Sequence, residues 1–222
     1  HDGNYNEDLL KQIDQFPVRK YFENFDYNKN IVTDTTKFWI KAQEMINSDN
    51  KLRFFKTHNV FGKVNNYDFT DTKNSIGAIY IVRDPRNVVT SFSKFKSLTV
   101  EQTADFMING TGDGLVWTNN WSVNYQSWKI FKEYERYLLI KYEDLISKPD
   151  KTFLNILEFI HKLNKTIFEL DKNKFENVIK TTSFDSMQKL EKEKGFSESS
   201  IDTTGKKIPC FNLGPKNDWR NK

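Results

Sequence analysis

The stretch YIVRDPRNVVTS, residues 80–91, places a basic residue and a hydroxyl residue around the start of a helix. The apolar run 76–82 is short and rich in β-branched residues, which is typical of a strand buried on both faces of a parallel sheet. Pro85 ends the strand and fits the first turn of a helix. Arg83 then lies at the carboxyl end of a strand, where open α/β sheets bind ligands. A guanidinium there, with Ser91 about two turns along the helix, suits an anion such as a phosphate.

A lysine and a histidine stand two residues apart where a second apolar run, 52–57, ends. Residues two apart on a strand share a face, so Lys56 and His58 can approach one group from the same side. The imidazole has a pKa near neutrality, which suits removal of a proton from a hydroxyl or an amine. A single histidine at a strand end is also often structural, so this pattern alone leaves both roles open.

A third strand is predicted over residues 137–141, directly before Tyr142-Glu-Asp. Two further short signatures follow, TTSF at 181–184 and GPKNDW at 214–219. Each feature has a structural alternative when it is taken alone. Arg83 and the adjacent aspartate form a local salt bridge in one interpretation, and acidic residues after Tyr142 favour the positive end of a helix. Phe184 fits a plain core position equally well.

The composition indicates a globular protein with a large polar surface. The chain has 222 residues, of which 37% are hydrophobic and 29% charged, and we expect a single domain over residues 1–222. A net charge of +4 is compatible with an anionic ligand but falls short of the dense basic stripe of a nucleic-acid-binding protein. No apolar stretch is long enough to span a membrane. Cys210 is the sole cysteine, which favours a reducing, cytoplasmic location.

The alternation of the predicted strands with helical segments predicts a three-layer α/β/α domain with a parallel central sheet. Two other segments have simpler interpretations. The glycine-containing stretch 110–114 is interpreted as a flexible loop, because no strand leads into it and no Lys-Ser/Thr pair closes it. Aromatic residues at helical spacing over 117–128 predict a helix face that lines a core or a cleft. The three histidines are far apart, so no metal site is predicted.

The five signatures KTH, RDP, YED, TTSF and GPKNDW, in this order, resemble the sulfotransferases that use 3′-phosphoadenosine 5′-phosphosulfate (PAPS). The resemblance extends from about residue 50 to residue 222. It implies a P-loop NTPase-like fold. It also implies transfer of a sulfuryl group from PAPS to a hydroxyl or amine of a small-molecule or carbohydrate acceptor, with adenosine 3′,5′-bisphosphate as the product nucleotide.

The resemblance also implies roles for individual residues. His58 corresponds to the catalytic base, and Lys56 to a lysine beside the transferring sulfuryl group. Arg83 and Ser91 correspond to the element that holds the 3′-phosphate, and Gly214 to a loop whose amides approach that phosphate. The residues that correspond to the adenine site are Tyr142 at the edge of the base, Thr182 and Ser183 along it, and Phe184 stacked on it.

Two family features are not at their expected places in this sequence. The 5′-phosphosulfate loop, a Pro-Lys-Ser/Cys-Gly-Thr-type stretch, does not occur in these 222 residues, and we expect it to precede His1. The Arg-Lys pair that usually precedes the loop glycine is Asn212-Leu213 here. We therefore expect Lys207 or Lys216 to supply the missing positive charge.

Two other classes of function remain open at this point. A P-loop-type small-molecule kinase would need a Walker lysine and a magnesium-binding carboxylate. A non-catalytic nucleotide-binding module would bind adenosine 3′,5′-bisphosphate without turnover.

Overall fold

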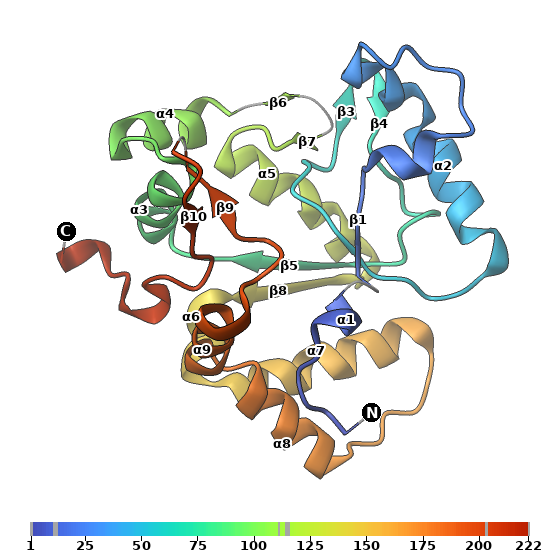
Figure 1. The fold of residues 1–222 in the computed structure, drawn as a ribbon. Coiled ribbons are helices and arrows are strands. Elements are labelled where there is room, and N and C mark those ends of the chain that lie inside the picture. Colours follow the sequence, from blue (N-terminus) through green and yellow to red (C-terminus); the bar gives the residue numbers. More distant parts are fainter. Residues whose placement is uncertain (1, 11–12, 111, 114–115, 203, 222) are drawn as a thin grey trace.

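The structure of the chain is a computed structural model that describes residues 2–10, 13–110, 112–113, 116–202 and 204–221. Helices predominate, and the strands are short (Figure 1). The chain is therefore a mixed α/β protein, with helices packed around small sheets.

Two parallel strands run side by side through the middle of the molecule, β5 (Ala78–Val82) and β8 (Tyr137–Lys141) (Figure 1). Their pairing sets Ala78 opposite Tyr137 and Val82 opposite Lys141. The strand expected over 137–141 has these same bounds, and the one expected over 76–82 starts two residues later. Ile81 is 61% exposed. This differs from the expected burial on both faces, because no element in the described part of the chain covers that side of β5.

The strand expected over 52–57 is reduced to two residues. β2 (Phe55–Lys56) pairs in parallel with β1 (Asp14–Gln15) and is not hydrogen-bonded to β5 or β8. Leu52 and Phe54 remain exposed and belong to no strand. The continuous central sheet that the sequence predicted is therefore present only as two small parallel pairs.

The segment 60–75, which its polar composition predicts to be a loop, contains a short hairpin. β3 (Lys63–Val64) pairs antiparallel with β4 (Tyr67–Asp68). Asn65 and Asn66 connect the strands with φ of 52° and 67°. Two positive φ values in a two-residue turn match the twist of the flanking strands, and asparagine tolerates this conformation.

The helix after β5 follows its sequence signals. α3 (Pro85–Lys96) has proline in its first turn, and the Asp84 side chain accepts a hydrogen bond from the Arg86 N–H as its cap. The Ser183 hydroxyl caps α9 (Phe184–Lys194) in the same way. The other helices are α1 (Glu7–Leu10), α2 (Trp39–Ile46), α4 (Val100–Asn109), α5 (Trp121–Ser127), α6 (Tyr142–Ser147), α7 (Pro149–Asn164) and α8 (Lys172–Thr181).

Short elements complete the chain. The 3-10 helices are η1 (Arg19–Phe22), η2 (Val32–Phe38), η3 (Asn47–Asp49), η4 (Trp128–Tyr134), η5 (Gly214–Lys216) and η6 (Trp219–Asn221). The remaining strands form antiparallel pairs, β6 (Gly112–Asp113) with β7 (Val116–Trp117) and β9 (Ser200–Ile201) with β10 (Lys207–Ile208). In the stretch 110–114, which the sequence predicts to be a flexible loop, Gly112 and Asp113 instead form β6, because Val116 and Trp117 pair with them; residues 111 and 114 lie outside the described residues.

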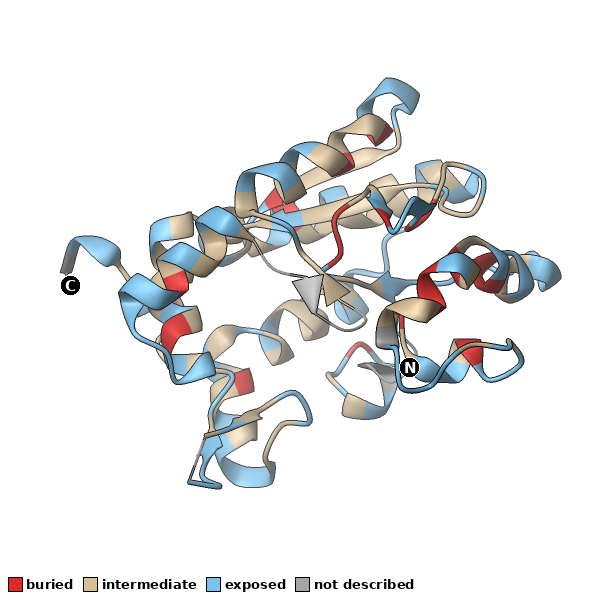
Figure 2. Cartoon of the chain, turned by 90° about the horizontal axis from the view of Figure 1, so that it is seen from above, coloured by how far each residue is buried: buried red, intermediate tan, exposed pale blue. Residues whose placement is uncertain are grey.

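The hydrophobic core is largely aromatic. Its buried members are Phe16, Phe22, Trp39, Ala42, Val64, Phe69, Trp128 and Phe131. Figure 2 shows buried residues on several helices, while most loops are exposed. The aromatic residues predicted to share one helix face are divided by Asn120, which caps α5. Trp128 joins the core, whereas Trp121 and Tyr125 stack on one another outside it, with ring centres 5.7 Å apart.

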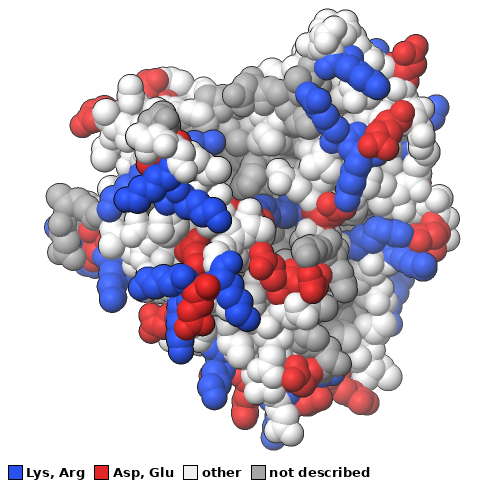
Figure 3. Space-filling model, viewed as in Figure 1, with Lys and Arg blue, Asp and Glu red and all other residues white. Residues whose placement is uncertain are grey.

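Basic and acidic side chains are mixed on the face of the molecule seen in Figure 3. None of the helices in the described part of the chain is both long and apolar enough to cross a membrane. Among the described side chains, no group of three or more histidine, cysteine, aspartate and glutamate residues is placed to hold a metal ion.

Candidate functional site

Arg83 lies at the end of β5 and contacts two distant parts of the chain. Its Nη2 donates a hydrogen bond to the Gly214 carbonyl at 2.7 Å and reaches the Asn217 carbonyl at 3.5 Å. Its guanidinium carbon lies 4.3 Å from the centre of the Tyr142 ring, within cation–π distance. The Nε atom is buried and has no hydrogen-bond partner in the described structure. One donor of the guanidinium is therefore left without a partner among the described residues.

The neighbouring aspartate does not pair with Arg83. The Asp84 carboxylate instead lies 2.7 Å from Nη2 of Arg86. The local salt bridge that offered a structural explanation for Arg83 is therefore not the contact that forms. Burial raises the pKa of the Tyr142 hydroxyl, while the adjacent Arg83 opposes that shift.

Asn217 fastens the segment after Gly214 to α3. Its side chain is almost fully buried; Oδ1 accepts from the Thr90 hydroxyl at 3.0 Å, and Nδ2 donates to the Asn87 carbonyl at 2.7 Å. Arg83 donates to the carbonyls of Gly214 and Asn217, which lie in this segment. The bonds from Asn217 to α3 therefore also hold the Arg83 guanidinium in place. Sequence reasoning missed Asn217, although it lies within the GPKNDW signature.

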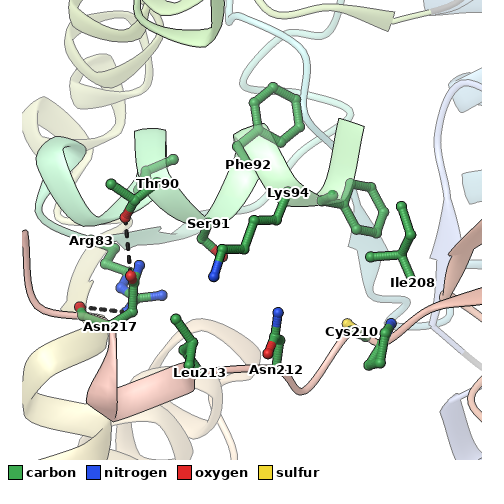
Figure 4. Close-up of a pocket in the computed structure, with 13 residues that line it drawn as sticks. Arg83, Thr90, Ser91, Phe92, Lys94, Ile208, Cys210, Asn212, Leu213 and Asn217 are labelled. Atoms are coloured by element: carbon green, nitrogen blue, oxygen red, sulfur yellow. Dashed lines mark hydrogen bonds between the residues drawn. The ribbon is translucent and has the colours of Figure 1, made fainter. Parts of the chain in front are cut away.

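A pocket of about 270 Å³ opens between α3 and the segment 208–213 (Figure 4). Arg83, Ser91 and Lys94 line one side of it, and Asn212 and Leu213 line the other. Within the described structure, no hydrogen bond occupies the backbone N–H groups of Asn212 and Leu213 or the Ser91 hydroxyl. The walls therefore offer several free donors, and the arrangement suits an anion.

Two side chains of α9 hold the far wall of this pocket. The Glu191 carboxylate accepts hydrogen bonds from the N–H groups of Cys210 at 2.8 Å and Phe211 at 2.9 Å. Nε2 of Gln188 donates to the carbonyls of Phe211 and Asn212, both at 2.8 Å. Backbone groups of three consecutive residues are thus fixed by one helix. Neither side chain was identified from the sequence, because nothing local links α9 to a loop about twenty residues away.

Three of the residues expected to contact adenine, Thr182, Ser183 and Phe184, lie at the start of α9. The Phe184 ring packs against Gly214 so closely that a Cβ at residue 214 would lie 2.1 Å from its Cε2 atom. Gly214 also has a φ of 48°, which favours glycine. The Thr182 hydroxyl donates to the Val178 carbonyl at 2.6 Å, and Ser183 caps the helix. These two hydroxyls therefore have hydrogen-bond partners nearby in the sequence. Phe184, in contrast, connects the first turn of α9 with the segment at Gly214.

Lys56 and His58 form a second cluster with Glu198. Both carboxylate oxygens of Glu198 lie close to Nζ of Lys56, at 2.6 and 2.7 Å. The His58 side chain is partly exposed to solvent. The surrounding protein still removes part of its hydration, which lowers the pKa of the imidazole, and the positive charge of Lys56 lowers this pKa further. The negative charge of Glu198 acts in the opposite direction. A histidine in this setting stays neutral, and so able to accept a proton, to a lower pH than usual.

The two clusters are neighbours. Cys210 lines the pocket beside Asn212, and the charges of Lys56 and Glu198 act on its thiol. Burial raises the pKa of that thiol, and Glu191 and Glu198 raise it further. The structure therefore brings Arg83, Ser91, Tyr142, Phe184 and Gly214 into one site, with Lys56 and His58 beside it.

The lysines that the sequence offered as substitutes for the missing Arg-Lys pair lie elsewhere. Lys207 lines a neighbouring pocket against α9, and Lys216 lines neither of these two pockets. Lys94, which sequence reasoning did not single out, is the lysine in the pocket with Arg83. Its spacing of three residues from Ser91 on a helix was the available signal.

A comparison with known protein families settles the relationship of the chain. The sulfotransferase domain family matches residues 4–222. This chain is a member of that family. The match confirms the resemblance drawn from the five sequence signatures.

Individual sulfotransferases are similar at low identity. The 3-beta-hydroxysteroid sulfotransferase of Cavia porcellus is 25% identical over 193 residues, which are 82% of this chain and 63% of that protein. Sulfotransferase 2A1 of Rattus norvegicus is 28% identical over 152 residues, 64% of this chain and 49% of that protein. The chain thus spans about half to two thirds of the length of these curated relatives.

A solved sulfotransferase has a similar fold. The mouse sulfotransferase SULT7A1, whose structure was solved in complex with PAP, superposes with a TM-score of 0.54 at 18% sequence identity. The superposition covers 81% of this chain and 64% of that one. At this identity the likeness concerns the fold alone.

Proposed function

We propose that this sulfotransferase-family chain binds PAPS and transfers its sulfuryl group to a hydroxyl or amine of a small-molecule or carbohydrate acceptor. The observation that carries the proposal is the pocket between α3 and the segment 208–213. There the buried Nε of Arg83, the Ser91 hydroxyl and the amides of Asn212 and Leu213 all lack partners among the residues that the structure describes. A buried donor without a partner is costly unless a ligand satisfies it.

The residues present fit the nucleotide end of PAPS. Arg83 and Ser91 would hold the 3′-phosphate, because both face the pocket and a guanidinium forms strong hydrogen bonds to phosphate oxygens. Phe184 and Tyr142 offer aromatic surface within contact of Gly214 and Arg83, respectively, which suits an adenine ring. Thr182 and Ser183 would contribute to the adenine site mainly through the backbone, because their hydroxyls are already engaged.

The catalytic roles would fall on the second cluster. Bound PAPS supplies an activated sulfuryl group, and the protein must position it, stabilise negative charge and remove a proton from the acceptor. His58 would accept that proton, since its lowered pKa keeps the imidazole neutral. Lys56 would stabilise the charge that develops on the sulfuryl oxygens once Glu198 releases it.

We also infer the finer organisation of the fold. The parallel β5–β8 pair, with Arg83 and Tyr142 at its carboxyl ends, is consistent with a three-layer α/β/α domain of the P-loop NTPase-like type. The likeness to a solved sulfotransferase supports this inference.

A labelled-donor assay tests the proposed function. The protein is incubated with PAPS carrying a radioactive sulfuryl group and a panel of hydroxylated and amino acceptors, and labelled products are separated. We expect transfer to at least one acceptor, and His58→Ala should lower turnover about a hundredfold while leaving nucleotide affinity unchanged. Binding of adenosine 3′,5′-bisphosphate without transfer to any acceptor would favour the non-catalytic binding module. Phosphoryl transfer from ATP to the same panel would favour the kinase.

A further inference from the structure

We propose that Lys94 is a phosphate-binding residue of this pocket, and that with Arg83 and Ser91 it contacts the 3′-phosphate of the nucleotide. The inference rests on the proposed function and adds a residue that the family signatures do not include. It also explains how the site can work with Asn212-Leu213 in place of a basic pair.

The position of Lys94 follows from the geometry of α3. Ser91 and Lys94 are three residues apart, so both project from the same face of the helix. In Figure 4 the Lys94 side chain runs back along α3 so that its ammonium group points toward Ser91 and the loop at Leu213. A lysine near the C-terminal end of a helix normally reaches toward the last carbonyls of that helix or toward solvent. This one turns into the pocket.

The charged side chains described in the lining of the pocket are all positive. Among the described residues, its lining contains two cationic side chains, Arg83 and Lys94, and no aspartate or glutamate. The ammonium group of Lys94 forms no ion pair or hydrogen bond with any other residue that the structure describes, whereas the ammonium groups of Lys56 and Lys162 pair with Glu198 and Glu135. Two like charges in one pocket without a carboxylate are stabilised by an anion between them.

The two walls of the pocket offer different kinds of donor to an anion. The wall formed by residues 208–213 presents neutral backbone donors, and Glu191 holds that backbone in place without entering the lining. The positive charge must therefore come from the α3 wall. Lys207 is on the far side of the segment, in the pocket against α9, so it cannot replace Lys94 without a rearrangement of β10.

The test compares two nucleotides that differ in one group. Dissociation constants for adenosine 3′,5′-bisphosphate and for AMP, which lacks the 3′-phosphate, are measured by calorimetry for the wild type, Lys94→Gln and Lys94→Arg. Lys151→Gln on α7 and Lys207→Gln serve as controls with the same change of charge. Thermal melting of each variant checks the fold, which should be unchanged because Lys94 is exposed.

We expect Lys94→Gln to weaken binding of the bisphosphate by about threefold to tenfold, since the contact is charge-assisted but partly open to solvent. Binding of AMP should be unchanged. Lys94→Arg should restore most of the affinity, and both controls should behave as the wild type. Equal affinity of wild type and Lys94→Gln for the bisphosphate, or an equal loss for both nucleotides, would overturn the assignment while leaving the proposed function intact. A wild-type protein that does not bind the bisphosphate would overturn both.

Discussion

The Glu198 carboxylate is bound side-on to the ammonium group of Lys56, with its two oxygens 2.6 and 2.7 Å from Nζ. Glu198 comes from the segment between α9 and β9, 142 residues away in sequence. A carboxylate in this place competes with any other anion for the same lysine. In the proposed reaction, this pair would limit how much of the Lys56 charge is available to the sulfuryl group of the donor.

Removing the Glu198 charge should strengthen donor binding. For Glu198→Gln we expect the affinity for PAPS, measured without acceptor, to rise about twofold to fivefold, the range of a solvent-exposed ion pair. Glu193→Gln removes the same charge from an exposed position on α9 and should have no effect. Equal affinities of wild type and Glu198→Gln for PAPS would mean that the donor does not compete with this carboxylate.

The pKa of His58 should respond in opposite directions to the loss of Lys56 and to the loss of Glu198. In the wild type it should lie below its ordinary value of 6.5, because burial and Lys56 both disfavour the imidazolium. Lys56→Gln removes a positive charge and should raise this pKa, whereas Glu198→Gln removes a negative charge and should lower it. The measurement is an NMR titration of the imidazole protons of His58 in the wild type and both variants. A shift of the same sign in both variants would contradict the arrangement of charges around His58.

The loss of Arg83 should weaken nucleotide binding much more than the loss of its neighbour Arg86. Arg83→Ala removes charge-assisted hydrogen bonds and should cost roughly 1.5–3 kcal/mol of binding free energy for adenosine 3′,5′-bisphosphate. Arg86 lies 4.0 Å from the Trp219 ring and pairs with Asp84 outside the pocket. Arg86→Ala is therefore the matched control, and its affinity should equal that of the wild type. Similar losses of affinity for the two variants would show that Arg83 contributes only long-range electrostatic attraction and no specific hydrogen bond to the phosphate.

Cys210 provides a chemical probe of the pocket, because it is the sole cysteine of the chain. Glu191 raises the pKa of its thiol, so Glu191→Gln should lower that pKa and speed alkylation at a fixed pH. Adenosine 3′,5′-bisphosphate should slow alkylation of the wild type, because Cys210 lines the pocket. The rate is followed by mass spectrometry of the alkylated protein. If the nucleotide gave no protection, the ligand would have to bind away from the segment 208–213.

The parts of the fold with strong local signals were predictable. The strand over 137–141 has the expected bounds, and Asp84 and Pro85 begin α3 as their types predict. The strand expected over 52–57 is shorter, because an apolar run becomes a strand only where a partner pairs with it, and β1 offers two residues. The hairpin at Asn65 and Asn66 was not predicted, because the polar composition of its strands resembles that of a loop. The two positive φ values at the turn become visible only in the structure.

The candidate site was predictable only where a family signature marks it. Arg83, Ser91 and His58 stand at strand ends or on the helix that follows, and such positions can be recognised from patterns of about ten residues. Lys94 and Glu191 come to the pocket and its wall only because the segment 208–213 folds back between α3 and α9. Contacts of this kind depend on residues that are far apart in sequence, and no local pattern contains them.

The hydrogen bond from Arg83 to Gly214 joins residues 131 positions apart. A ribosome releases a chain from its N-terminal end, so β5 and α3 emerge long before the segment that completes their pocket. During that interval Arg83 and Lys94 have no wall opposite them, and any anion they meet is held by one side only. The pocket is thus completed only after the segment 208–214 has emerged, and an early stop before residue 214 would leave much of the helical scaffold without one wall of this pocket.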